Sequence, residues 1–522
     1  MTQQKSENGI LPEGRRKASP TQDSNRTEGG KAVPIEEASS QQLLLFATAE
    51  IPRLGRGAKP KQPKDLSMGK AVKVPKAKRK RLKAVAATLS VIVERLDESL
   101  EKVAANDGAP GPDRKTVDMV LLRWSVIRPK LVDALLSGSY QPGDIRRVWI
   151  PKGGGAKRGL GIPNVVDRVV QEAIRSVLEP IYEPTFHGSS HGFRPSRSCQ
   201  TAIAEAASYL DEGHTWVVDI DLEKFFDQVN HQRLMSRLAV RVSDKSVLAL
   251  IGKLLKASVV MPDGVRVRNE EGVPQGGPLS PLLSNVVLSE LDSELDQRGL
   301  RFVRYADDCN IYVRSERAGT RVMESVTRFI EGRLRLKVNA AKSAVARPET
   351  RHFLGFSLTP SSDGPTRILL SKRSIERLAK RVVELTPRNR GSSLKAIISS
   401  VNQYLIGWDG FFNICTPEVE RVLSTTDAHI RRRLRAIVLK HWKRRSTIVK
   451  RLIRLGVNRR TAWRRIYEGR KSLWNLSHDP AVDRGLRNAY FAERGLISLR
   501  DRARARWEAD VAHRQQLLPG MS

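Results

Sequence analysis

The sequence predicts an α+β protein, in which strands and helices alternate through a first folded region and helices alone make up a second. Short runs of β-branched and aromatic residues at 215–222 and 301–313 have the composition and period of strands. Apolar residues at 165–181 and 282–295 recur at the spacing of amphipathic helices. After the turn-rich stretch TPRNRGSS at 386–393, helical periodicity continues to the end.

Composition divides the 522 residues into an extension, two folded regions and a tail. Residues 1–83 are rich in Ser, Gln, Gly, Pro and Lys, which predicts a disordered, basic extension. We expect the mixed α+β region at 84–370, the helical region at 371–500 and a C-terminal tail at 501–522. The extension ends in the basic run KAVKVPKAKRKRLK at 70–83, which suits contact with RNA and equally suits a solvated linker.

The expected helices follow from apolar spacing and from end signals. An N-terminal helix is predicted over 85–103, before the loop GAPGPD. Another carries an apolar face over 165–181, and a third covers 282–295 and stops at Gly299, which suits a C-terminal cap. In the helical region, one apolar stripe comprises Leu394, Ile397, Ile398, Val401 and Leu405.

Two adjacent carboxylates, Asp307 and Asp308, mark the stretch RFVRYADDCNIYV at 301–313. Strand-forming residues at 301–306 and 309–313 flank the pair, so a tight β-hairpin with both acids in its turn is predicted. Two carboxylates at such a tip can share a Mg²⁺ ion, the hard cation that phosphoryl and nucleotidyl transfer uses. For the pair alone, the alternative is a solvated turn, where Asp is common.

A second acidic strand lies upstream in TWVVDIDLEKFFDQVNH at 215–231. Asp219 and Asp221 alternate with apolar residues, so the two carboxylates share one face of the strand. Such a face is unfavourable unless the acids bind a metal, take up a proton or pair with Arg and Lys. Together with the hairpin, these acids could hold two Mg²⁺ ions, which is the arrangement of two-metal nucleotidyl transfer.

Basic residues outnumber acidic ones, 92 against 56, and the net charge is +36. This excess favours a polyanionic partner, because Lys and Arg release the counterions that surround nucleic acid. Aromatic residues make up only 5% of the chain, which favours grip on phosphates and on A-form shape over single-strand stacking as the main binding mode. Charge alone fits a ribosomal or chromatin-like binder equally well.

The three cysteines, Cys199, Cys309 and Cys415, are widely spaced and form no C-x-x-C pair. Neither disulfides nor a structural zinc site is therefore expected. No apolar run reaches the length of about 18 residues that a transmembrane helix needs, so we expect no membrane span. Acidic residues between Glu7 and Glu37 argue against a transit peptide.

The chain resembles the group II intron-encoded reverse transcriptases and maturases, on motifs that occur here in the family's order. The most specific are YADD at 305–308 and DIDLEKFF at 219–226. The others are GAPGPDRKTVD at 108–118, RGLGIPNVVDRVVQEAI at 158–174, HGSSHGFRPSRS at 187–198, GVPQGGPLSPLLSNVVLSELD at 272–292, LKVNAAKS at 336–343 and FLGFSL at 353–358. The resemblance implies a right-hand polymerase, with fingers and palm at 84–370 and an α-helical thumb and maturase domain at 371–500.

The resemblance implies that the metal ligands are Asp221, Asp307 and Asp308, with the backbone carbonyl of Leu222 as an extra oxygen ligand. Two Mg²⁺ ions are implied, with Mn²⁺ as a substitute. The family's first catalytic Asp precedes an aromatic residue by five positions. Asp221, rather than the acid two residues before it, keeps that spacing to Phe226.

The resemblance also implies a set of nucleotide-binding residues. Lys152 and Arg158 would hold the triphosphate, a role that suits an ammonium and a forked guanidinium, and either also fits a solvated loop charge. Phe226 would lie under the incoming sugar and select deoxynucleotides, with ordinary core packing as the alternative. Gln275, in the turn Pro-Gln-Gly-Gly, would contact the nucleotide, and Lys342 would balance the carboxylates.

From 431 to 470 the sequence has sixteen Lys and Arg residues against one acid, Glu468, with two tryptophans between them. Positive helices with aromatic anchors suit a thumb that lies along a duplex or a structured RNA. The stretches at 401–412 and 484–499 resemble the maturase-specific domain, which implies binding of intron RNA, and a generic basic thumb is the alternative. The chain resembles the members of the family without a C-terminal HNH endonuclease domain.

The resemblance implies an RNA-directed DNA polymerase that copies intron RNA into DNA during intron mobility and assists splicing as a maturase. The implied partners are group II intron RNA, an RNA template with its DNA primer, a DNA target site and dNTPs, in the bacterial cytoplasm near the nucleoid. The oligomeric state stays open, as do two alternatives: a splicing-only RNA-binding maturase, and a reverse transcriptase adopted by a defence or CRISPR-linked system. The intact YADD, Asp221 and Gln275 favour the polymerase over the splicing-only protein.

Overall fold

The computed structural model describes four stretches of the chain, residues 87–153, 156–388, 391–469 and 471–516. The expected basic extension at 1–83 lies outside the described residues, and so do the start of the predicted N-terminal helix and the side chain of Lys152. None of the helices in the described stretches is long and apolar enough to cross a membrane.

The N-terminal segment forms two helices where the sequence predicts one. They are α2 (Leu89–Glu94) and α3 (Leu96–Ala105). They separate at Arg95, whose amide donates to the Ile92 carbonyl in a tighter turn that interrupts the α-helical repeat. After the GAPGPD loop come α4 (Val117–Leu122) and α5 (Trp124–Leu136). The helices α2, α3 and α4 all contact the long helix α6 (Val165–Tyr182), which confirms the predicted helix at 165–181.

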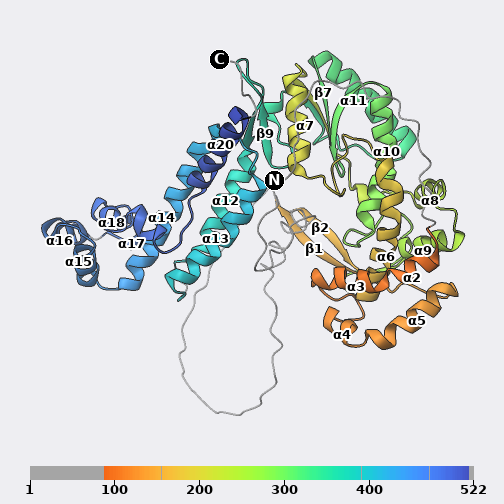
Figure 1. Cartoon of the computed structure of the whole chain (residues 1–522), viewed down its shortest axis with the longest axis horizontal. Coiled ribbons are helices and arrows are strands. Elements are labelled where there is room, and N and C mark those ends of the chain that lie inside the picture. The colour runs from red at the N-terminus through yellow and green to blue at the C-terminus, as the bar shows by residue number, and fades with distance from the viewer. Residues whose placement is uncertain (1–86, 154–155, 389–390, 470, 517–522) are drawn as a thin grey trace, which may run out of the picture. The chain divides into compact units, whose positions relative to one another are not determined.

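One four-stranded sheet has the order β2-β1-β4-β5, and we call it the fingers sheet after the subdomain that the sequence motifs imply. Its strands are β1 (Ile145–Gly153), β2 (Ala156–Ile162), β4 (Val259–Val260) and β5 (Arg266–Val267). The first two form a long antiparallel hairpin, and β4 runs parallel to β1. This sheet lies beside the N-terminal helices in Figure 1.

A second four-stranded sheet has the order β6-β7-β3-β8, and we call it the palm sheet after the subdomain that the sequence motifs imply. Its strands are β3 (Trp216–Ile220), β6 (Arg301–Tyr305), β7 (Asp308–Val313) and β8 (Ala344–Ala346). Helix α7 (Cys199–Asp211) precedes β3, and the helices between the strands are α8 (His231–Ala239), α9 (Lys245–Leu255), α10 (Ser280–Gln297) and α11 (Glu316–Phe329). Helix α10 confirms the prediction at 282–295, and Gly299 follows its end with a positive φ of 66°.

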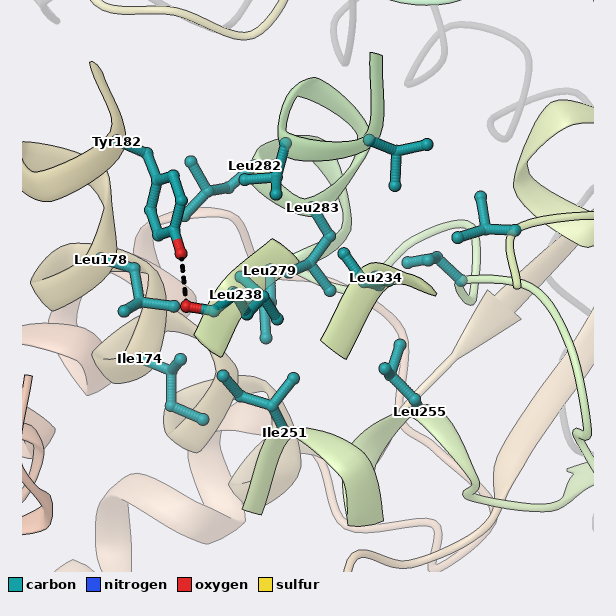
Figure 2. Close-up of a cluster of buried hydrophobic side chains, with 14 of the residues drawn as sticks. Ile174, Leu178, Tyr182, Leu234, Leu238, Ile251, Leu255, Leu279, Leu282 and Leu283 are labelled. Atoms are coloured by element: carbon teal, nitrogen blue, oxygen red, sulfur yellow. Dashed lines mark hydrogen bonds between the residues drawn. The ribbon is translucent and has the colours of Figure 1, made fainter. Parts of the chain in front are cut away.

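The two faces of the palm sheet pack into two different cores, as strand alternation requires. Val218 and Ile220 face the first core, which they share with α6, α8, α9 and α10. Figure 2 shows the helical part of this core, where leucine and isoleucine side chains from the four helices meet. Tyr182 lies at its margin and donates its hydroxyl proton to the carbonyl oxygen of Leu238 at 2.9 Å.

The second core joins the other face of the palm sheet to the helical region. Val217, Val303 and Tyr312 contribute from the sheet, and α7 lies over them. A two-stranded sheet of β9 (Phe356–Thr359) and β10 (Arg367–Leu370) follows, and then α12 (Lys372–Leu385), α13 (Leu394–Phe411), α14 (Glu420–Trp442), α15 (Arg445–Arg454), α16 (Arg459–Tyr467), α17 (Leu473–Leu476), α18 (Pro480–Gly485), α19 (Asn488–Ala492) and α20 (Leu499–Gln516).

The region after β10 is entirely helical in the described residues, and together with the strand-containing region before it this confirms the predicted α+β class. Four of the five residues in the predicted stripe on α13 are buried, and the fifth, Leu394, is packed partly against the same core. Residues 501–516, expected as a tail, continue helix α20 and pack on α14. Ala503 is fully buried there, and Arg502 and Arg506 both donate to Asp409 of α13.

Candidate active site

The Tyr-Ala-Asp-Asp motif forms the predicted hairpin with a turn of two residues. Tyr305, the last residue of β6, pairs with Asp308, the first residue of β7. Asp307 therefore lies in the turn with Ala306, and the prediction that both acids lie in the turn was wrong for Asp308. The turn is short because Ala306 adopts a positive φ of 56°, the backbone twist that joins two antiparallel strands most tightly.

The register of the palm sheet brings Asp221 opposite Asp308. The ladder between β3 and β7 ends at the pair Ile220 and Cys309. Asp221 and Asp308 are the next residue of each chain segment, so continuation of the register sets them across from each other. Two acids more than eighty residues apart in the sequence thus meet at one edge of the sheet, beside the turn that carries Asp307.

Lys342 lies on the other side of Asp221. Its Nζ is 3.2 Å from Oδ1 and 3.4 Å from Oδ2 of Asp221. The backbone of Asp221 is fixed at the same place, since its amide donates to the Ser343 hydroxyl at 3.0 Å and its carbonyl accepts from the Asn339 amide at 2.8 Å. A positive charge therefore lies against the first acid, where the sequence predicted that Lys342 would balance the carboxylates.

Asp219 shares a face with Asp221, as predicted, but it is held in an ion pair. The guanidinium of Arg351 donates to Asp219 Oδ2 through Nε at 3.0 Å, and also to the carbonyl oxygen of Lys342 at 2.6 Å. Burial raises the pKa of the Asp219 carboxyl, and the hydrogen bond and charge of Arg351 oppose that rise. Pairing with Arg or Lys, which the sequence left open for both acids, holds for each of them: Asp219 pairs with Arg351 and Asp221 with Lys342.

The acids at the sheet edge have the donor chemistry of a magnesium site. Carboxylate oxygens are the ligands that Mg²⁺ prefers, and Asp221, Asp307 and Asp308 supply them from neighbouring strand ends. Leu222 follows with a buried side chain and a backbone bridge to Val338. Within the described stretches, no three His, Cys, Asp or Glu side chains are gathered closely enough to form a ready-made metal cluster.

A cavity of about 300 Å³ lies between the fingers sheet and the palm. Arg147, Trp149 and Gly161 line it from the hairpin of β1 and β2, and Phe226 and Pro274 line it from the opposite side. The Phe226 ring packs edge-on against Phe225, which is itself buried in the first core. The structure thus separates the two phenylalanines: the first fills the core, and the second is half-buried at a cavity.

Close backbone contact positions Gln275 beside the fingers. The amide of Gly161 donates to the Gln275 carbonyl at 2.6 Å. A Cβ atom on Gly276, whose φ is 121°, would collide with the Gly161 carbonyl oxygen. Glycine is therefore required at position 276 of the Pro-Gln-Gly-Gly turn. Arg158 pairs with Ile150 and by alternation lies on the opposite face of the hairpin from the cavity-lining Trp149.

Arg304 is a buried cation behind the turn that the sequence reasoning missed. Both Asp292 oxygens accept from it at 2.6 Å, and its other donors bind Ser190 Oγ, Asn285 Oδ1 and the Ala306 carbonyl oxygen. All five guanidinium donors are satisfied. The available signal was position: Arg304 shares a face with Phe302 on a strand that is buried on both faces, where an arginine requires a buried acid.

Comparison with known proteins supplies the family. Residues 150–358 match the model of the reverse transcriptase (RNA-dependent DNA polymerase) family, and residues 375–454 match the group II intron maturase-specific domain. The chain is also 34% identical over 349 residues to protein YkfC of Escherichia coli (strain K12), a match that covers 59% of this chain and 89% of that protein. The chain belongs to the group II intron reverse transcriptase and maturase family.

Two further similarities cover less of each protein. The group II intron-encoded protein LtrA of Lactococcus lactis subsp. cremoris is 40% identical over 176 residues, which are 34% of this chain and 29% of LtrA. A solved partial Cas6-RT-Cas1–Cas2 complex is 25% identical, covers 47% of this chain and 42% of its own, and has a TM-score of 0.31. Family membership rests on the two matched domains and on YkfC, and it confirms the resemblance identified from the sequence motifs.

Proposed function

We propose that this chain is an RNA-directed DNA polymerase that copies intron RNA into DNA and assists the splicing of that RNA as a maturase. The observation that carries the proposal is the register that sets Asp221 opposite Asp308, with Asp307 in the adjoining turn. A family member that only bound RNA would need none of these acids at one sheet edge. A carboxylate pair at that edge is costly unless positive charge, from a side chain such as Lys342 or from a metal ion, lies beside it.

In this proposal Asp221, Asp307, Asp308 and the backbone oxygen of Leu222 hold two Mg²⁺ ions, for which Mn²⁺ can substitute. Bound there, the ions would favour ionisation of the primer 3′ hydroxyl and stabilise the leaving pyrophosphate. Lys342 offsets part of the repulsion among the carboxylates, because its ammonium contacts Asp221. Arg351 ties the Lys342 backbone to Asp219 and so keeps that ammonium in place.

The incoming deoxynucleotide is assigned to the space beside Phe226. The half-buried ring would meet a 2′ hydroxyl on the incoming sugar, so dNTPs are selected over ribonucleotides. Gln275 would contact the nucleotide from the turn that the Gly161 amide holds. Lys152 and Arg158 would bind the triphosphate, because their charges suit phosphate oxygens. Arg158 lies on the hairpin face opposite the cavity, so in this proposal the triphosphate would leave the cavity and reach that face.

The maturase function is assigned to the helical region. We assign fingers and palm to 84–370 and the thumb and maturase domain to the helical region from 371, which helix α20 extends past the expected boundary at 500 to residue 516. The net charge of +36 and the basic helices after 430 suit group II intron RNA, an RNA template with its DNA primer and a DNA target site. Such templates and targets would place the protein in the bacterial cytoplasm, near the nucleoid.

The test is dNTP incorporation on a poly(rA) template with an oligo(dT) primer and Mg²⁺. We expect incorporation by the wild type and none by the double variant Asp307→Asn plus Asp308→Asn, which keeps the size of both side chains. Asp118→Asn, the same change at an exposed acid of α4, is the matched control and retains activity. A folded wild type that binds intron RNA and incorporates nothing would overturn the polymerase proposal in favour of a splicing-only maturase.

A further inference from the structure

Helix α16 carries two stacked aromatic rings on its outer side. The ring centroids of Trp463 and Tyr467 are 5.2 Å apart and their planes differ by 21°. The side chains remain 41% and 47% exposed, whereas Ala462 and Ile466 of the same helix are fully buried. Residues four apart are neighbours on a helix surface, so the buried pair anchors α16 and the rings stack in the open.

Uncompensated positive charge surrounds these rings. Arg459 and Arg460 lie one helical turn before Trp463, and Arg464 lies one turn before Tyr467. All three are exposed, and within the described stretches no carboxylate lies at ion-pair distance from any of them. The neighbouring Arg465 differs, because Glu468 accepts from it at 3.2 Å.

We propose that this surface of α16 binds an unpaired base of a single-stranded nucleic acid, with the base stacked on Trp463 and the flanking phosphates held by Arg459, Arg460 and Arg464. Every base presents a π face, and stacking on an aromatic side chain is independent of sequence. The bases of a duplex are stacked on one another and cannot reach the ring. The site therefore separates unpaired from paired strands.

The ring pair is already ordered before a base arrives. Tyr467 stacks on the indole of Trp463, and α16 packs on α15 and α18 through buried apolar residues. Figure 1 shows these short helices gathered together at one end of the helical region. Because a rigid ring loses little conformational entropy on binding, a single stacked base contributes more to the binding free energy.

The surface is separate from the polymerase and from the matched domains. Helix α16 begins at Arg459, after the match to the maturase-specific domain ends at 454. The inference rests on the proposed function only in taking nucleic acid as the partner, and it does not require polymerisation. Trp, Tyr and Arg are also enriched at protein interfaces. Three exposed arginines that form no ion pair within the described stretches, in a chain of charge +36, favour a polyanion.

The experiment measures the affinity of the full-length protein for short labelled oligoadenylate strands by fluorescence anisotropy. The arms are the ribo strand, the deoxy strand and a blunt duplex of the same length. We expect Trp463→Leu to weaken binding of the single strands by about tenfold, which is the contribution of one stacked base, and to leave duplex binding unchanged. Trp463→Phe keeps an aromatic face and is the matched control, with affinity near the wild-type value.

A second measurement locates the base directly. Strands that contain 5-iodouridine are cross-linked by light to the wild type, and the modified peptide is identified by mass spectrometry. We expect the adduct on Trp463 or Tyr467. In the anisotropy measurement, a loss of affinity of Trp463→Leu for the ribo strand alone identifies RNA as the ligand, and a loss for both strands identifies any single strand. The inference would be overturned if the cross-links were confined to other helices and Trp463→Leu bound the strands as tightly as the wild type. It would also be overturned if Trp463→Leu lost affinity equally for single strands and for the duplex.

The two proposals fail separately. Asp307→Asn plus Asp308→Asn is expected to lose primer extension and to keep wild-type affinity for the oligoadenylate strands, because α16 contributes nothing to the acids of the palm. If the wild type extends the primer but Trp463→Leu binds single strands as tightly as the wild type, only the α16 inference fails. Retained stacking in a protein that cannot extend a primer would leave the α16 site standing and remove only the polymerase.

Discussion

The guanidinium of Arg304 bends around the end of its own strand and donates a hydrogen bond of 2.8 Å to the carbonyl oxygen of Ala306. Ala306 has a positive φ of 56°, which costs a residue other than glycine about 1 kcal/mol. Arg304 is in turn held by both oxygens of Asp292, and both side chains are buried. The turn that carries Asp307 is therefore braced from the protein interior by a buried ion pair.

Arg304→Met is expected to lower the free energy of unfolding by about 3–5 kcal/mol, because it leaves the Asp292 carboxylate buried without its cation. Urea denaturation followed by circular dichroism measures the change. The exposed Arg317→Met on α11 is the matched control and should unfold like the wild type within about 0.5 kcal/mol.

The double variant Arg304→Met plus Asp292→Leu separates stability from positioning. Replacing both members of a buried pair by apolar residues is often close to neutral, so most of the lost stability should return. Primer extension should be lower than that of the wild type in both the single and the double variant, because the Ala306 carbonyl lacks its donor and the turn is free to relax. A stable double variant with wild-type extension would contradict a positioning role for Arg304.

Local patterns in the sequence predicted the elements whose residues depend on near neighbours. The apolar spacing of α6, α10 and α13 gave the positions of these helices, because a helix face is set by residues three and four apart. The hairpin of β6 and β7 was predictable for the same reason, since both strands and their turn lie within thirteen residues. The break at Arg95 has no such signal, because the apolar period continues across it.

Contacts between distant segments were beyond the residue patterns. Arg351 and Asp219 are 132 residues apart, and nothing in the period of either segment pairs them. The cavity beside Phe226 also requires the fingers hairpin to lie opposite the palm, which strand alternation alone does not specify. The acids themselves were predictable because metal chemistry demands carboxylates in a recognisable pattern, whereas the arginine that binds one of them could be any of many in a basic chain.

Asp219 and Asp221 are expected to respond differently to the same change. Asp221→Asn should reduce dNTP incorporation by roughly a hundredfold or more, because it removes a metal-binding carboxylate. Asp219→Asn leaves an oxygen that accepts from Arg351, so its effect should be less than about tenfold. Primer extension over a Mg²⁺ titration tests both: the Mg²⁺ requirement should rise for Asp221→Asn only, and equal shifts would make Asp219 a ligand too.

Phe226→Ala is expected to relax sugar selection. Removal of the ring opens the cavity wall where the 2′ hydroxyl of a ribonucleotide would lie, so the preference for dCTP over CTP should fall by roughly tenfold or more. The ratio of kcat/KM for the two nucleotides on a defined template measures it. Phe226→Tyr keeps the ring and should keep the preference, and unchanged selection in the alanine variant would return Phe226 to ordinary packing.

Glu205 is expected to make the fold sensitive to acid. Burial alone would raise the pKa of this carboxyl, but hydrogen bonds from His191, Ser189 and Tyr209 together lower it below the ordinary value of 4.5. A lowered pKa stabilises the fold above that value, and the contribution is lost as the pH falls through the folded pKa. The His191 amide binds the Arg304 carbonyl oxygen, so this network supports the strand before the turn.

Glu205→Gln should therefore cost about 2 kcal/mol at neutral pH and less as the pH falls below 4.5, since the wild type loses its charged acceptor there. Urea denaturation at a series of pH values gives the two curves, and they should converge in acid. Glu324→Gln, at an exposed glutamate of α11, is the control and should run parallel to the wild type. Parallel curves for Glu205→Gln would show that its charge is not linked to folding.

Gly276→Ala is expected to impair activity more than it impairs the fold. Its Cβ would meet the Gly161 carbonyl oxygen, so the Pro-Gln-Gly-Gly turn would be pushed away from β2 and Gln275 would shift with it. Gly264 offers a matched control, because its φ of 87° is also positive but a methyl group there would meet no atom of the described residues within 4 Å. Gly264→Ala should cost about 1 kcal/mol of backbone strain and leave primer extension intact. Equal loss of extension in both variants would mean that strain, rather than the contact with Gly161, explains the glycine.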